Sequence, residues 1–92
     1  MEIKKIFENR SFKIMNVALL KGEILPNHRA TSDAFIIVQR GSAKIIFDDI
    51  EIPLHHNSTQ LIPANKKHSL KVLEDFNASI VFSIEGEIEF IL

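Results

Sequence analysis

The sequence of 92 residues has no cysteine, no tryptophan and no tyrosine. The lack of cysteine excludes disulfide bonds, thiolate catalysis and zinc sites that use cysteine ligands. The lack of tyrosine excludes a phenol as the acid partner of a histidine base, and the lack of tryptophan weakens the case for stacking against a sugar ring. Thiol chemistry is therefore excluded, and paired histidine–tyrosine chemistry has no second partner.

A strong net charge and a long apolar segment are also missing. The formal net charge is −1, so no long-range field attracts nucleic acid or an anionic membrane. The longest apolar run covers residues 34–38, far short of the roughly 20 residues of a membrane helix. Residues 1–8 lack the apolar centre of a signal peptide. We therefore expect a cytoplasmic protein with neither nucleic-acid nor membrane partners.

The sequence does contain a series of short segments typical of β-strands. Its length suits one domain, residues 1–92, and its mixture of 46% hydrophobic and 25% charged residues is that of a globular protein. β-Branched and aromatic residues recur in short runs between turn residues, without a clean helical period. Short connections favour antiparallel pairing. We expect an all-β barrel or sandwich with no helix longer than about two turns.

The turn residues divide the chain into ten expected strands. Two of the expected breaks lie at residues 40–42 and 74–75, and the three prolines fall at expected strand ends. The expected strands are 3–7, 11–20, 23–28, 34–39, 43–47, 50–54, 59–62, 69–73, 78–84 and 87–91.

The expected strand 34–39 is apolar on both faces. Ile36 and Val38 point to one side, and Phe35 and Ile37 point to the other. A small barrel covers only its inner face, so a second sheet, the chain's own terminal strands or a second subunit must cover the outer face. We expect a homodimer whose interface uses strand surface. Further apolar residues near the two chain ends support the same expectation: Ile3, Ile6, Phe7, Ile88, Phe90, Ile91 and Leu92.

Two short stretches of the sequence contain spaced glycine, histidine and proline residues. In the first, GEILPNHRATSDAFIIVQRG, Gly22, His28 and Gly41 are separated by five and twelve residues. These positions match the first cupin motif, which runs glycine, five residues, His-x-His, three or four residues, Glu, six residues, glycine. The sequence therefore resembles the small cupins in this motif, although the second histidine and the glutamate are replaced.

The second cupin motif runs glycine, five residues, Pro-x-Gly, two residues, His, three residues, Asn. Pro63 and His68 match its centre, with Asn57 and Asn65 at the two glycine positions and Val72 at the last position. Asparagine tolerates positive φ better than other non-glycine residues. The resemblance covers about residues 14–84 and implies a small jelly-roll β-barrel with mostly antiparallel strands.

In a metal-binding cupin, the two motifs supply four ligands. The resemblance places these positions at His28, Ala30, Ala34 and His68. A catalytic divalent metal normally needs at least three protein ligands, so we expect no resident metal or other cofactor, with His28 and His68 as weak metal candidates. Asp33, next to the glutamate position, should face away from the interior unless a bulge turns it inward.

The two alanines leave an interior that is larger, drier and more apolar than a metal-binding cupin's. We expect a pocket for a small, partly apolar organic ligand, lined by His28, Ala30, Ala34, Ile36, Val38 and His68. The leading interpretation is a non-enzymatic or vestigial small-molecule-binding barrel. The alternative is a metal-dependent cupin enzyme of dioxygenase or isomerase type with an irregular two-histidine site, and its catalytic residues stay unknown. A further alternative is an interior filled by Ile36, Val38, Ile80 and Phe82, which binds nothing.

Two other polar pairs have simple interpretations. His55 and His56 adjoin a turn, where we expect surface histidines. Lys66 and Lys67 precede His68, where we expect a solvated loop, although lysines at a barrel rim can also attract an anionic ligand.

Overall fold

The computed structural model describes residues 1–91 and consists of eight strands. The strands are β1 (Glu2–Glu8), β2 (Phe12–Leu19), β3 (Ile24–Ala30), β4 (Ala34–Ile46), β5 (Glu51–Leu54), β6 (Thr59–Ile62), β7 (His68–Ser83) and β8 (Ile88–Phe90). Residues 1–91 contain no helix, so this part of the chain has none that could cross a bilayer. The prediction of an all-β fold is confirmed.

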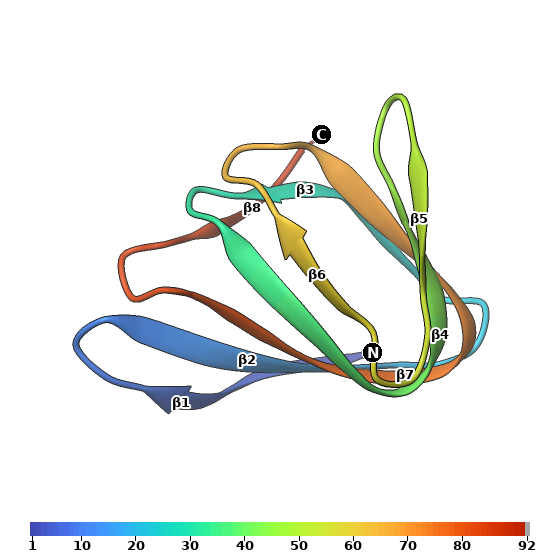
Figure 1. Ribbon diagram of the computed structural model, residues 1–92, viewed down its shortest axis with the longest axis horizontal. Helices are drawn as coiled ribbons and strands as arrows, with labels where there is room; N and C mark the ends of the chain where they lie inside the picture. The colour runs from blue at the N-terminus through green and yellow to red at the C-terminus, as the bar shows by residue number, and fades with distance from the viewer. Residues whose placement is uncertain (92) are drawn as a thin grey trace.

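All strand pairs are antiparallel, and β7 is the central strand because it pairs with β2, β3 and β4. The longest hydrogen-bonded path runs β1-β2-β7-β3-β8, while β4 pairs with β5, β6 and β7. The sheet curls around a common interior, and the β1–β2 hairpin extends to one side (Figure 1). This is the predicted barrel with mostly antiparallel strands.

The predicted breaks at residues 40–42 and 74–75 are wrong, because both segments lie inside long strands. Strand β4 continues through Gly41, and its register against β7 shifts at Arg40 and Ser42. Gly41 has φ +81°, and a Cβ there would lie 2.0 Å from the Asp75 carbonyl oxygen. The turn-type residues therefore make bulges that bend β4 and β7 together, instead of reversing the chain.

The core lies inside the curled sheet, where the strands alternate inward and outward. In β4, Ala34, Ile36 and Val38 are buried, while Phe35 and Ile37 are 40% and 36% exposed. The expected alternation of this strand is confirmed.

The outer face of the sheet carries a row of apolar side chains across five strands. Register places Phe7 beside Ile14, Ile14 beside Val81, Val81 beside Phe35, and Phe35 beside Leu61. We call Phe7, Ile14, Val81, Phe35 and Leu61 the outer apolar row. Its members come from β1, β2, β7, β4 and β6 in that order.

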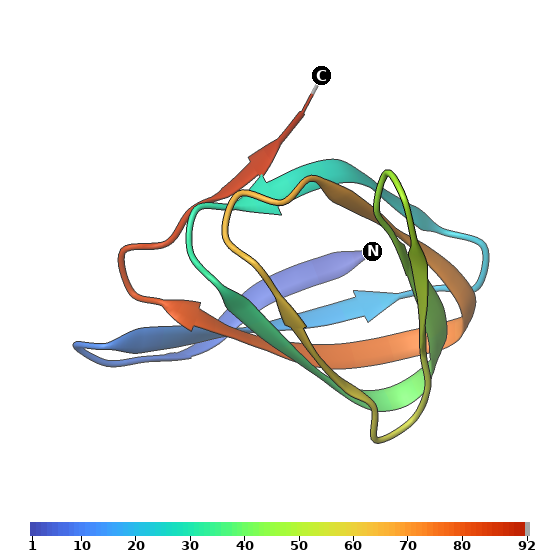
Figure 2. The ribbon, with the colours of Figure 1, turned by 45° about the horizontal axis from the view of Figure 1, so that its top comes forward.

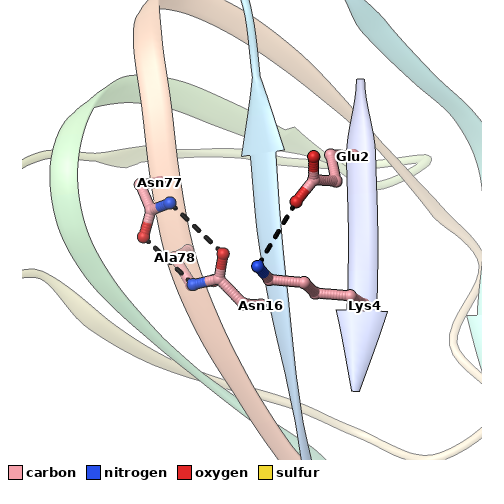
Figure 3. A network of polar contacts seen from close by, with 5 residues as sticks. All are labelled: Glu2, Lys4, Asn16, Asn77 and Ala78. Atoms are coloured by element: carbon pink, nitrogen blue, oxygen red, sulfur yellow. Dashed lines mark hydrogen bonds and ion pairs between the residues drawn. The ribbon is translucent and has the colours of Figure 1, made fainter. Parts of the chain in front are cut away.

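Next to this row, the same face becomes polar. The amides of Asn16 and Asn77 bond each other in both directions, at 3.1 and 3.3 Å. Lys4 and Glu2 form an ion pair of 3.5 Å beside them. Figure 3 shows this polar network across β1, β2 and β7. The outer face thus has an apolar part and a polar part whose groups are already paired.

Candidate functional site

Two buried histidines lie side by side on the inner face of the sheet. His28 on β3 and His68 on β7 are direct register partners. Their ring centroids are 4.2 Å apart in a T-shaped arrangement, and the residues are 8% and 5% exposed. The prediction that these two residues meet, 40 positions apart in sequence, is confirmed.

A bulge in β3 turns His28 inward. The ladder pairs Leu25 with Leu70 and then His28 with His68, so β3 has one residue more than β7 between the two pairs. Regular alternation from the buried Leu25 would place residue 27 inward and residue 28 outward. The extra residue shifts the alternation by one position, so His28 points inward. Pro26 lies in the bulge, where its missing N–H removes no needed ladder bond.

Hydrogen bonds to the backbone fix which nitrogen of each ring carries the proton. The Nδ1 of His28 lies 2.7 Å from the Pro26 carbonyl oxygen, and the Nδ1 of His68 lies 2.8 Å from that of Lys66. A carbonyl oxygen only accepts, so each Nδ1 is the donor. Each Nε2 of the neutral rings then has a free lone pair. The pair therefore presents two hydrogen-bond acceptors.

Burial favours the neutral form of both rings. Desolvation lowers the pKa of His28 below its ordinary value, and the hydrogen bond to Pro26 opposes this effect. Desolvation also lowers the pKa of His68, against its hydrogen bond to Lys66 and with a further contribution from His28. A proton on one ring disfavours a proton on the other. At neutral pH both imidazoles are thus uncharged.

The histidines form the centre of a row of four rings from neighbouring strands. Phe47 follows β4 and lies 5.6 Å from His68, while Phe90 on β8 lies 5.6 Å from His28. The ammonium of Lys66 lies 4.5 Å above the ring of Phe47. Phe47 is buried and Phe90 is 52% exposed, so the row runs from the core to the surface. In Figure 2, β8 lies along β3 at this surface end.

A small cavity of about 30 Å³ adjoins the histidine pair. Besides the two imidazoles, its wall is entirely apolar: Val17, Leu25, Ile36, Ile45, Ile62, Leu70, Phe76 and Ile80. A space of this volume is the share of about one water molecule. The interior beside the histidines is therefore apolar and holds a small space.

The structure brings three of the expected pocket residues to this cavity and leaves three outside its wall. His28, Ile36 and His68 line it, whereas Ala30, Ala34 and Val38 are buried in the surrounding core. The other seven wall residues were not assigned to the pocket from the sequence. Strand alternation marks most of them as inward-facing, but it does not show which inward side chains meet at one point.

The remaining polar residues lie away from the cavity. Asp33 is exposed and accepts a 2.8 Å hydrogen bond from the Ala64 N–H. His55 and His56 are exposed, as predicted. Lys67 forms an exposed ion pair of 3.6 Å with Asp48.

The donor set does not fit a resident divalent metal. Ala30 and Ala34, at the positions of the other two cupin ligands, have only methyl groups, and Asp33 bonds the backbone elsewhere. Within residues 1–91, no three potential metal-ligating side chains are grouped together. Two imidazoles are fewer than the three protein ligands of an ordinary catalytic site.

Comparison with protein-family models gives no match, and none of the curated proteins matches the chain. Solved structures do match. A cupin superfamily protein from Desulfitobacterium hafniense superposes with a TM-score of 0.83 at 21% identity, over 91% of this chain and 77% of that one. An RmlC-like cupin with a double-stranded β-helix fold, from Methanocaldococcus jannaschii, has a TM-score of 0.80 at 18% identity, over 89% and 78% of the two chains.

An enzyme of known activity also has this architecture. The DMSP lyase DddQ from Ruegeria pomeroyi superposes with a TM-score of 0.81 at 15% identity, over 89% of this chain and 44% of that one. The likenesses show that the chain has the cupin double-stranded β-helix fold. Because this fold carries many unrelated activities, it does not select one.

Proposed function

We propose that this cupin-fold chain is a metal-free, non-enzymatic barrel that binds a small organic molecule at His28 and His68. The observation that carries the proposal is the pair of neutral imidazoles beside an apolar interior cavity. A ligand site is typically an apolar concavity with a few polar groups that fix orientation. The cavity wall provides no third polar side chain to act as acid, base or nucleophile.

The test observes the histidines directly. A library of small neutral and charged organic compounds is titrated against protein with ¹⁵N-labelled histidine, and the imidazole resonances are recorded. We expect saturable shifts at His28 and His68, while the exposed His55 and His56 act as internal controls. Shifts confined to His55 and His56, or no saturable shift at all, would refute ligand binding at this site.

The metal-dependent alternative has its own measurement. The protein is purified without added metal, analysed for metal content, and titrated with Zn²⁺, Ni²⁺, Mn²⁺ and Fe²⁺. We expect no stoichiometric metal and only weak binding, because two imidazoles supply two of the ligands required. One equivalent of metal that is lost in His28→Ala would replace our proposal by a metal-dependent enzyme.

We also propose that two copies of the chain pair through the outer face of the sheet. Phe7, Phe35 and Leu61 of the outer apolar row are 49%, 40% and 50% exposed, and the neighbouring Ile37 is 36% exposed. The row crosses five strands in register, and such a surface fits another sheet face. The adjacent polar groups are paired with each other. They therefore offer no unpaired charge to a charged partner, whereas a second copy presents the same apolar row.

The terminal strands add to this proposal. Strand β1 pairs with β2, and β8 pairs with β3, so both fold onto their own barrel. Their apolar residues nevertheless stay at least one third exposed: Ile3 38%, Ile6 51%, Phe7 49%, Ile88 37% and Phe90 52%. Ile91 is partly buried, and Leu92 lies outside the described residues. Folding onto the barrel therefore does not cover these side chains.

A further inference from the structure

We infer that the histidine pair selects ligands with a neutral NH₂ head group, and that a primary carboxamide is the class of molecule it binds. The inference rests on the proposed function and assigns the chemistry of its ligand. It follows from the direction of two hydrogen bonds, the wall of the cavity, and the position of the Lys66 charge.

The site presents acceptors and no donors. Both Nδ1–H groups donate to carbonyl oxygens of their own strand or loop, at Pro26 and Lys66. The Nε2 atoms of His28 and His68 are left as acceptors on two rings 4.2 Å apart. An acceptor-only head such as a carboxylate would place lone pairs against lone pairs. A head with two N–H bonds satisfies both imidazoles at once.

The apolar wall and the nearby charge of Lys66 disfavour a cationic head. Apart from the two imidazoles, the cavity is lined only by apolar side chains, so no carboxylate compensates a buried ammonium ion. Lys66 places its own ammonium over Phe47, the ring next to His68. A second positive charge would be repelled by it. A neutral amide nitrogen has the two donors without this cost.

The volume limits which part of the ligand is inside. About 30 Å³ accommodates one small group of the size of a water molecule. An NH₂ group in this space lies beside both imidazole rings. The remainder of the amide then extends along the ring row toward Phe90, whose ring lies 5.6 Å from that of His28.

The test compares one molecule that has two N–H donors with two analogues that have none. Propionamide, propionate and N,N-dimethylpropionamide are titrated at pH 8 at millimolar concentrations, with the histidine imidazole ¹⁵N resonances as the readout. We expect propionamide to shift both His28 and His68, and to bind about tenfold or more tightly than the two analogues, because each analogue lacks both N–H donors. Shifts of His55 and His56 report non-specific contact.

A substitution at the exposed end of the ring row gives a second test of the inference. Phe90 is half-exposed on a short edge strand, so Phe90→Ala should fold normally and weaken propionamide binding several-fold. Leu73→Ala, a similarly exposed position on β7, is the matched control and should leave binding unchanged.

The outcomes separate the inference from the proposed function. Propionate that binds as tightly as propionamide refutes the NH₂ assignment, and so does selective binding of library compounds without N–H donors, although either result leaves ligand binding at the pair intact. Failure of every compound to shift His28 and His68 refutes the assignment together with the proposed function.

Discussion

At the scale of single residues, the chemistry of the site depends on where two imidazole protons are held. The Pro26 and Lys66 carbonyls each accept from the Nδ1 of the histidine two positions later. Both bonds are local in sequence, so each ring keeps its tautomer as long as its own backbone segment keeps its shape. Burial then opposes a second proton on either ring.

Protein stability should therefore fall on acidification. Both histidines have a pKa below their ordinary value of 6.5 in the folded state. Below pH 6.5 the unfolded chain takes up protons that the folded chain resists, so the free energy of unfolding is greatest above this pH and falls as the pH drops toward the folded pKa values. Urea unfolding at a series of values between about pH 5 and 8 measures the slope.

Variants assign this pH dependence to the pair. Replacing the buried pair in His28→Phe/His68→Leu should flatten the slope near pH 6, whereas His55→Gln/His56→Gln should preserve it. If the surface variant flattens the slope instead, the buried pair is not its source.

A second residue-scale prediction concerns Asn65, which has φ +64°. Its N–H donates a 2.7 Å bond to the Ala30 carbonyl and ties the β6–β7 loop to the end of β3. Asn65→Gly should change the free energy of unfolding by less than about 0.5 kcal/mol, because glycine adopts this conformation freely. Asn65→Val should cost about 1–2 kcal/mol, because a β-branched residue resists positive φ. Chemical denaturation of the two Asn65 variants provides the measurement, and equal stabilities of the two would contradict the backbone argument.

At the scale of elements, the bend that the paired strands β4 and β7 share lets one sheet surround the core. Gly41 in β4 approaches the backbone of Glu74 and Asp75 so closely that any side chain would overlap it. The bulges around Arg40 and Ser42 bend both strands at this point. The first half of β7 can then pair with β3 and its second half with β2.

Gly41→Ala should be more destabilising than Gly22→Ala. Both glycines have positive φ, +81° and +87°, but a Cβ at Gly22 has no atom within 4 Å, whereas one at Gly41 lies 2.0 Å from the Asp75 oxygen. Gly22→Ala should cost about 1–2 kcal/mol from backbone conformation alone. Gly41→Ala should cost at least about 2 kcal/mol more, through displacement of β4 from β7. Urea denaturation measures the stability of both variants. Similar costs would show that β4 and β7 accommodate the added methyl group without strain.

At the scale of the whole molecule, an exposed apolar row across a curled sheet favours burial against a partner surface. Isolated apolar residues are ordinary on protein surfaces, but contiguous patches mark interaction sites. The outer apolar row is contiguous by register. A two-fold dimer buries the same patch of both copies in one closed interface.

Light scattering at tens of micromolar should therefore give about twice the chain mass of 10.5 kDa. Phe35→Glu should return the mass to that of one chain, because a buried, unpaired carboxylate in the interface is costly. Ile50→Glu, at a hairpin position that is 51% exposed and outside the row, is the matched control and should stay dimeric. A wild-type mass near 10.5 kDa would reject the dimer, and a dimeric Phe35→Glu variant would move the interface elsewhere.

The sequence alone determined the features that depend on neighbouring residues. Alternation in short runs indicated an all-β fold, and in β4 it placed Ile36 and Phe35 on opposite faces, which the structure confirms. Motif spacing predicted the meeting of His28 and His68. The asparagines in place of glycine have positive φ, at 69° for Asn57 and 64° for Asn65, which agrees with the tolerance on which the motif match relied. Each of these properties follows from local backbone preference or from the family resemblance.

Only the tertiary structure decided the features that depend on pairing between distant strands. The bulge that turns His28 inward is defined by the register of β3 against β7. Gly41 bends a strand instead of ending it because the backbone of Asp75 lies against it. The cavity is small because side chains from five strands, among them Ile36, Ile62 and Ile80, converge on the space beside the two histidines. Alternation tells which side of a strand a residue occupies, but the phase of a bulge and the filling of a cavity are set by contacts far apart in the chain.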